Sequence, residues 1–441
     1  NKYRLPRYRG QEWVKAELPT SVRPWAEGKR KSLRQRRAGH RENCERLGKL
    51  IGQHDWHWPT RPVCFITDMH ADTDALIASL VASGEIHKTG PKDGDFRLTK
   101  AARKTHFVIG GDCFDKGPSN LRLLRMLRRL IKRGAHLRLL AGNHDIRVML
   151  GMRSVGNLRT DTNQHFFVRM GPKMIPLIQE LSEQYLDKAS LRQVPSNRRC
   201  RELLYPSAQW QEQFPALAKG VLSKSTIERE LDKIVKKMER LDHLCEVNDL
   251  SMKQVYAAAL QWQKLFLKSG GEFHWFFDRL RLFHRQGSFL FIHAGLDDNV
   301  ADLIHRKGIK HLNKRFRKQL KGDDLMFYYG PLANSIRTKY RAADYPLSRK
   351  GVRLAHESGV HAIVHGHRNV YHGQRISLRR DMINFECDTT MDRGSRSKEG
   401  LKGAGAGVTL IRPKEKIVLG ISSDYKHAKV FDPSNPCAQE S

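Results

Sequence analysis

Three short polar motifs hold the side chains best suited to metal chemistry in this sequence of 441 residues. The motifs are Thr-Asp-Met-His at 67–70, Gly-Asp-Cys-Phe-Asp-Lys-Gly at 111–117 and Gly-Asn-His-Asp at 142–145. Their carboxylate, imidazole and amide oxygen groups suit Mn, Fe, Zn or Mg, whereas a structural zinc site normally uses cysteine thiolates. A pair of such ions can activate water and neutralise the oxygens of an in-line displacement at phosphorus. The motifs therefore predict a two-metal site for phosphoric ester chemistry.

Each motif directly follows a short apolar run, and such a run predicts a buried strand. The runs cover 63–66, 107–109 and 137–140, and two segments with helical periodicity, 74–81 and 121–131, lie between them. This order predicts a parallel β-α-β-α-β unit, whose ligand sites lie beyond the carboxyl ends of the strands. The residues expected to converge there are Asp68, His70, Asp112, Asp115, Asn143 and His144.

Two later segments complete a resemblance to a known family. They are Phe-Leu-Phe-Ile-His-Ala-Gly-Leu at 289–296 and Ala-Ile-Val-His-Gly-His at 362–367. The five motifs, in this order, resemble those of the calcineurin-like metallophosphoesterase superfamily. They are most similar to its phosphoprotein phosphatase branch, whose usual motifs include GDxHG, GDxVDRG and GNHE. The resemblance implies an α/β fold, a four-layer α/β/β/α sandwich, in which apolar runs at 382–388, 406–411 and 416–421 supply strands of a second sheet.

The resemblance also implies the ligands of two divalent or trivalent metal ions. Asp68 and His70 would bind one ion, Asp112 would bridge both, and Asn143, His293 and His367 would bind the other. Mn, Fe, Zn and Mg all accept this ligand set. Among them we expect manganese.

Catalytic roles follow from the same resemblance. A metal-bridging hydroxide would attack phosphorus, and His144 would act as the general acid that protonates the leaving oxygen. Asp115 would hydrogen-bond the imidazole and fix its tautomer. The substrate phosphate would be bound by Lys116, Asn143, Arg147 and His365, with Arg337 as a further candidate. His365 has an equally good alternative role, which is to hold its own loop by a hydrogen bond.

The sequence departs from the branch at four motif positions. One is His365, where many members have arginine or a small residue. Lys116 stands where the branch usually has arginine, so it supplies charge without a bidentate contact to phosphate. Ala71 replaces a glycine, and Asp145 replaces a glutamate.

The motifs divide the chain into five parts. We expect a basic N-terminal arm at 1–60, the first half of the phosphoesterase domain at 61–145, a mainly helical insertion at 146–285, the second half at 286–424 and a polar tail at 425–441. Within the insertion, a capping signature that starts at Ser225 and an apolar stripe over 252–266 predict an antiparallel helical hairpin. Because the insertion separates two ligand motifs, it should stand beside the active site as a lid or substrate platform. A glycine-rich stretch at 394–407 predicts a mobile loop.

Composition points to anionic partners. Lys and Arg number 80 against 46 Asp and Glu, which gives a net charge of +34. Such a surface attracts nucleic acid or other polyanions, or it is only a solvated basic surface. The first sixty residues combine a basic cluster between Lys29 and Arg41 with Trp13, Trp25, Trp56 and Trp58. These residues either contact nucleic acid or pack the arm onto the catalytic domain.

Seven cysteines without a Cys-x-x-Cys pair favour a reducing compartment. No apolar run approaches the ~18 residues of a transmembrane helix, and no signal peptide is recognisable. We therefore expect a cytoplasmic location and no transmembrane segment.

Three functions are compatible with these features. The first is a metal-dependent phosphatase, that is, a phosphomonoesterase acting on phosphoserine, phosphothreonine or a small phosphate ester. The alternative is a phosphodiesterase or a nucleotide or nucleic-acid hydrolase, including one that cleaves diadenosine polyphosphates. The third is a catalytically silent nucleic-acid-binding protein, which the complete set of ligand motifs disfavours.

Overall fold

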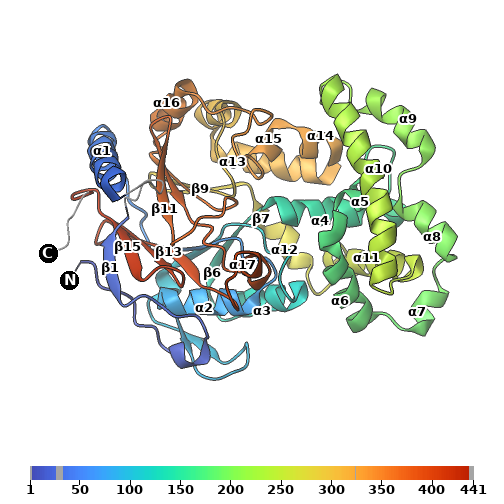
Figure 1. Ribbon diagram of the computed structural model, residues 1–441, viewed down its shortest axis with the longest axis horizontal. Helices are drawn as coiled ribbons and strands as arrows, with labels where there is room; N and C mark the ends of the chain where they lie inside the picture. The colour runs from blue at the N-terminus through green and yellow to red at the C-terminus, as the bar shows by residue number, and fades with distance from the viewer. Residues whose placement is uncertain (1, 26–32, 323, 437–441) are drawn as a thin grey trace.

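The computed structural model describes residues 2–25, 33–322 and 324–436. Two facing β-sheets form its centre (Figure 1). The larger sheet has the order β1 (Ser21–Pro24), β15 (His427–Phe431), β14 (Ile417–Ser422), β13 (Gly407–Arg412), β2 (Val63–Ile66), β5 (His106–Ile109), β6 (His136–Leu140) and β7 (Leu280–Arg281). The smaller sheet has the order β11 (Arg375–Arg379), β12 (Met382–Glu386), β10 (Ala362–His365), β9 (Phe289–Ile292) and β8 (Phe283–Gln286). A separate hairpin consists of β3 (Ile86–Lys88) and β4 (Phe96–Leu98).

The sheets pack together because side chains alternate between the two faces of each strand. In β2, Phe65 belongs to the core between the sheets and stacks obliquely on Phe291 of β9, whereas Ile66 belongs to the outer core. The helices α2 (Thr73–Ser83) and α3 (Asn120–Lys132) cover the larger sheet, and α13 (Asp298–Gly322) and α16 (Arg349–Glu357) cover the smaller one. The expected α/β fold with four layers is thus confirmed.

Two strands lie in a different sheet from the one expected. β13 and β14 extend the larger sheet, because β13 pairs antiparallel with β2, and Thr409 stands opposite Phe65. Only β12, of the three late apolar runs, joins the second sheet, where it pairs parallel with β10. An all-apolar run predicts a buried strand, but it carries no information about which sheet receives that strand.

The N-terminal segment packs onto the domain. β1 pairs parallel with β15, and Trp25 is buried edge-on against Phe385. Trp56 and Trp58 both contact Phe289, so they close one end of the core between the sheets. Of the four tryptophans, only Trp13 is largely exposed. The structure therefore favours packing as the role of the other three.

The side chains of the basic cluster lie outside the described residues, although the backbone of α1 (Leu33–Gly52) is described from Leu33 onward. At the other end of the chain, the expectation of a polar tail is wrong for residues 427–431, because β15 pairs with both β14 and β1. The expected mobile loop at 394–407 is also wrong in part. Residues Arg393–Lys398 form the short helix α17, in which Arg396 is buried and forms an ion pair with Asp424.

The chain between β6 and β7 forms a cluster of helices, which lies at the side of the sandwich (Figure 1). Its members are α4 (Asn143–Arg153), α5 (Phe166–Arg169), α6 (Ile175–Tyr185), α7 (Lys188–Arg192), α8 (Asn197–Leu204), α9 (Ala208–Leu217), α10 (Lys224–Val247), α11 (Met252–Phe266) and α12 (His274–Arg279). Ser223, two residues before the expected position, caps α10. The predicted hairpin is not the main packing unit, because α10 packs mainly on α5 and the turn Gly171–Met174, while α11 packs mainly on α6 and α8.

Two short helices, α14 (Asp324–Tyr329) and α15 (Pro331–Asn334), follow α13. Among the described residues, no helix is long and apolar enough to cross a membrane. The six described cysteines are buried, and Cys64, Cys113, Cys200, Cys245 and Cys387 are free thiols.

Candidate active site

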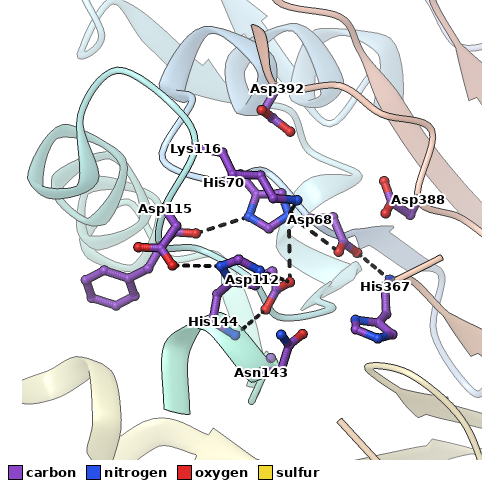
Figure 2. A network of polar contacts seen from close by, with 12 residues as sticks. Asp68, His70, Asp112, Asp115, Lys116, Asn143, His144, His367, Asp388 and Asp392 are labelled. Carbon is purple, nitrogen blue, oxygen red and sulfur yellow. Dashed lines mark hydrogen bonds and ion pairs between the residues drawn. The ribbon is translucent and has the colours of Figure 1, made fainter. Parts of the chain in front are cut away.

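Loops at the carboxyl ends of five strands meet at one edge of the sandwich. The larger sheet contributes the loops after β2, β5 and β6, and the smaller sheet contributes those after β9 and β10 (Figure 2). Several site residues have left-handed backbone conformations, namely Asp68, His70, Asp112, Asp115, Lys116 and His367. Residues other than glycine rarely adopt this conformation, and it costs of order 1 kcal/mol or more each, so such clustering is typical of functional sites.

Glycines allow the loops to approach so closely. A side chain at Gly142 would collide with Asp112, and one at Gly366 would collide with the carboxylate of Asp68. These contacts explain why glycine precedes Asn143 and His367 in the two motifs.

Two groups of buried ligand atoms share one carboxylate. His70, Asp112 and His144 form the first group, Asp112, His293 and His367 form the second, and within each group the ligand atoms lie within 4.8 Å of one another. Oδ2 of Asp112 lies 3.7 Å from Nε2 of His70 and 3.4 Å from Nε2 of His293. Asp112 is therefore placed between two potential cation sites.

The remaining predicted ligands border these groups. Oδ1 of Asp68 lies 3.8 Å from Nε2 of His70, and Oδ1 of Asn143 lies 3.2 Å from Nε2 of His293. The other carboxylate oxygen of Asp68 accepts a hydrogen bond from the backbone N–H of His367. All six predicted ligands thus converge, at the edge where the sequence places them.

Backbone carbonyls set the tautomers of three histidines. Nδ1 of His70 donates to the carbonyl of Phe114, and Nδ1 of His293 donates to that of Gly110. Nε2 of His367 donates to the carbonyl of Arg337. In each ring this leaves the other nitrogen to act as the ligand atom when the ring is neutral, which is the arrangement that metal-binding histidines require.

The electrostatics of the site also suit cations. Burial opposes a charge on His293, but the carboxylates of Asp112 and Asp68 outweigh it and raise the pKa of His293 to about 10. Burial and Asp112 raise the pKa of Asp145 to about 7. Both shifts show that negative charge is concentrated here, and bound cations would relieve it. The donor set therefore fits a pair of metal ions.

Residues 61–227 match the family model of calcineurin-like phosphoesterases. This stretch of the chain is therefore a calcineurin-like phosphoesterase region. This family of hydrolases binds a binuclear metal centre. No curated protein sequence matches the chain.

Solved structures resemble this phosphoesterase only distantly. A cold-active protein-tyrosine phosphatase of a psychrophilic Shewanella species is 15% identical, with a TM-score of 0.40, over 85% of this chain and 81% of that chain. Another structure of a cold-active protein tyrosine phosphatase is 16% identical, with a TM-score of 0.42, over 88% and 84% of the two chains. A protein serine/threonine phosphatase from Saccharomyces cerevisiae is 10% identical, with a TM-score of 0.33, over 90% and 89%.

One buried histidine of this phosphoesterase is held by a carboxylate. Nδ1 of His144 lies 2.7 Å from Oδ2 of Asp115, and Arg147 donates to the same oxygen at 2.7 Å. Burial alone would raise the pKa of Asp115, but the hydrogen bonds from His144 and Arg147 outweigh it and lower that pKa. Nε2 of His144 is left facing Asp112, at 4.0 Å from its carboxylate.

Several cations surround this histidine. Nζ of Lys116 lies 2.8 Å from Nε2 of His70, and Nε of Arg147 is buried without a hydrogen-bond partner. Burial, followed by the charges of Arg147 and Lys116, lowers the pKa of Lys173 to about 8. Lys173 lies in the turn Gly171–Met174, so the helical region between the ligand motifs contributes a cation to this site.

Asp145 has a structural position. Its carboxylate accepts hydrogen bonds from the backbone N–H groups of Asp112, Cys113 and Gly142 at 2.8–2.9 Å, and a longer one from Phe114. The aspartate that replaces the usual glutamate therefore ties the second motif loop to the third.

Two other predicted residues lie outside the ligand groups. His365 is fully buried, its Nδ1 hydrogen-bonds the carbonyl of Gly366, and its Nε2 accepts from Arg368 at 2.9 Å. The side chain of Arg337 donates to the carbonyl of Tyr328. These contacts favour the loop-holding role of His365 over contact with substrate.

Sequence reasoning missed Asp388. It is buried two residues after β12, close to Asp68 and Lys116, and Figure 2 shows it beside the ligand groups with Asp392. Burial and the charge of Asp68 raise the pKa of Asp388 well above its usual range. The rule that identified the other residues, a polar side chain beyond the carboxyl end of a buried strand, applies to Asp388 as well.

Proposed function

We propose that this phosphoesterase is a two-metal phosphomonoesterase, a protein phosphatase for phosphoserine or phosphothreonine or a phosphatase for a small phosphate ester. The observation that carries the proposal is the buried hydrogen bond between His144 and Asp115. Nε2 of His144 faces the carboxylate of Asp112, and cations lie nearby. The buried thiols of Cys64, Cys113, Cys200, Cys245 and Cys387 fit the reducing cytoplasm in which we place the protein.

The donor set supports a site for each of two metal ions. Asp68, His70 and Asp112 would hold one ion, and Asp112, Asn143, His293 and His367 would hold the other. When bound, the ions would lower the pKa of water and neutralise charge on the phosphoryl oxygens. Lys116 donates to the nitrogen of His70 that would ligate, so its ammonium must turn away on metal binding and becomes free to contact phosphate.

The chain's own acid catalyst is His144. Asp115 accepts the hydrogen bond from Nδ1–H, so when His144 is an imidazolium its second proton lies on Nε2, and that proton would pass to the leaving oxygen. Arg147 neutralises Asp115 and keeps its carboxylate in position. General acid catalysis of this kind contributes roughly 10²–10⁴-fold to a rate.

Local charge favours a monoester over a diester. A phosphate monoester is a dianion near neutral pH, whereas a diester carries one charge and a second bulky group. Lys116, Arg147 and Lys173 supply cations on one side of His144. This concentration of positive charge supports a dianionic substrate. Because Lys173 comes from the helical region, it also supports the role of that region as a substrate platform.

One observation favours the alternative, a hydrolase of nucleotides or nucleic acid. A hollow of about 960 Å³ lies beside the kink of α13 at Gly308 and is lined by many basic side chains, including Arg281, Arg285, Arg306, Lys307 and Lys310. A basic hollow of this size suits a polyanion.

Hydrolysis of p-nitrophenyl phosphate and bis-p-nitrophenyl phosphate tests the proposal. Metal-stripped protein is supplied in turn with Mn, Mg, Zn and Fe, and an Asp112→Asn variant purified in the same way controls for contaminating phosphatases. We expect faster cleavage of the monoester, with the highest rate in manganese. Preference for the diester would support the alternative, and silence with every metal would contradict both hydrolase functions.

A further inference from the structure

Three histidines converge at the opposite end of β10 from the active site. His54 follows α1, His356 lies in the last turn of α16, and His361 directly precedes β10. Their ligand nitrogens lie within 4.8 Å of one another. The ring centroid of His54 lies 4.2 Å from that of His356 and 4.5 Å from that of His361. His367, in contrast, follows the carboxyl end of β10, so the two histidine groups are separated by the length of a strand.

His361 has an unsatisfied buried nitrogen. Its side chain is 8% exposed, and its Nδ1 is buried without a hydrogen-bond partner. Leaving a buried polar atom unsatisfied costs roughly 1–3 kcal/mol. A stacked aromatic cluster would explain the contact between the rings, but it would not satisfy this nitrogen.

The chemistry of the group is that of a metal site. Burial lowers the pKa values of His356 and His361 to about 4, so both rings are neutral near neutral pH and their lone pairs are available. Three imidazoles without thiolates suit zinc, copper or nickel, and zinc is often held by three protein ligands with water in the fourth position.

We propose that His54, His356 and His361 bind a zinc ion that fastens the segment after α1 to α16 and β10. Zinc–nitrogen bonds of about 2.0–2.1 Å place the ligand atoms of a tetrahedral site about 3.4 Å apart. The ligand atoms, which lie within 4.8 Å of one another, therefore close by at most about 1.4 Å on binding, and the partly exposed ring of His54 tilts out of its stack on His361.

The fourth position is open to solvent. A hollow of about 550 Å³ adjoins His54 and His356 and is lined by Arg46, Arg349, Arg353 and Arg380 together with Asp381. Water or a small anion can enter there. The basic walls favour an anion, and an anionic fourth ligand would offset the charge of the zinc ion. Asp55 and Asp381 are the nearby carboxylates that favour positive charge at His361 and His356.

Zinc counting tests the proposal directly. Full-length protein without a histidine tag is stripped with chelator, dialysed against zinc and analysed by elemental mass spectrometry. We expect His54→Ala and His356→Ala each to bind one zinc ion fewer per chain than the wild type, whereas His243→Ala, which removes an exposed histidine of α10, should bind the same number. Equal zinc content in the wild type and both site variants would overturn the proposal. The test compares the zinc content of each variant with that of the wild type, so zinc bound at the catalytic centre cancels out.

Two further readouts separate a built site from loose surface binding. Co²⁺ in the wild type should give the visible absorption of a tetrahedral nitrogen site, and His54→Ala should lose that component. Zinc should raise the Tm of the wild type more than that of His54→Ala, because the ion fixes α1 only when all three ligands are present. Phosphatase activity at saturating metal should be the same in both proteins. An identical cobalt spectrum and zinc response in the two proteins would contradict the assignment.

Discussion

Oδ2 of Asp115 accepts hydrogen bonds from both Nδ1 of His144 and the guanidinium of Arg147, each at 2.7 Å. The shared oxygen fixes the imidazole in one tautomer and turns Nε2 towards Asp112. The geometry is complete without substrate, so the acid catalyst is preorganised.

Replacing His144 should separate acid catalysis from metal binding. In His144→Asn we expect kcat for p-nitrophenyl phosphate to fall roughly 10²–10⁴-fold, because no group then protonates the leaving oxygen. The metal content should remain that of the wild type, since His144 is assigned no ligand role. Elemental analysis of the purified variant checks this, and loss of metal would show that His144 is a ligand.

Lys173 should act on substrate binding. Lys173→Met removes a cation that lies near Arg147 and Lys116, so KM for a phosphate monoester should rise roughly 3–10-fold while kcat stays within about twofold. Lys236→Met, at an exposed position of α10, is the matched control and should leave both constants unchanged. An unchanged KM in Lys173→Met would remove the main support for the substrate platform.

Asp145 should stabilise the fold. Asp145→Ala leaves four buried backbone N–H groups without their acceptor, and each costs about 1–3 kcal/mol, so unfolding in urea should require at least roughly 4 kcal/mol less. The measurement is made in chelator, so that lost metal binding does not contribute. Asp161→Ala, at an exposed site, should change the stability by less than about 0.5 kcal/mol. A loss below about 1 kcal/mol in Asp145→Ala would show that water replaces the carboxylate.

Glu85 should make stability fall as the pH rises. Burial raises its pKa from 4.5 to about 7, and Oε2 has no hydrogen-bond partner. The folded state therefore binds this proton more tightly than the unfolded state, and its contribution is present below pH 4.5 and lost as the pH rises to about 7.

The variant Glu85→Gln removes this titration. Urea unfolding at pH 5 and pH 8 should show that the wild type loses roughly 1–3 kcal/mol more than the variant between these values. Glu183→Gln, at an exposed position of α6, should follow the wild type. Parallel profiles for the wild type and Glu85→Gln would mean that Glu85 is ionised in the folded protein.

Local sequence was sufficient for the centre of the fold. The apolar runs before Asp68, Asp112 and Asn143 form β2, β5 and β6, and the segments between them form α2 and α3. Order along the chain then decides the topology, because short parallel crossovers leave few alternatives. The convergence of the ligand side chains at one edge follows from that topology.

Properties that depend on distant contacts were less accessible. β13 and β14 are mostly apolar, so their sequence is compatible with either sheet. The glycine-rich segment after Asp392 becomes ordered because Arg393 binds Asp72 and Asp74, far away in the chain. The role of Asp388 is equally non-local, since only the pairing of β12 with β10 brings it to the site.

The antiparallel pairing of β2 with β13 has a consequence for biosynthesis. A nascent chain that has reached β6 contains the parallel strands β2, β5 and β6, but the edge of β2 stays unpaired until the late strand β13 leaves the ribosome. The ligand set is also incomplete until His367 has been synthesised, 299 residues after Asp68. Contacts over such separations slow folding and prolong the exposure of apolar strand edges to aggregation. The protein should thus depend on chaperones during synthesis and acquire its metals only afterwards.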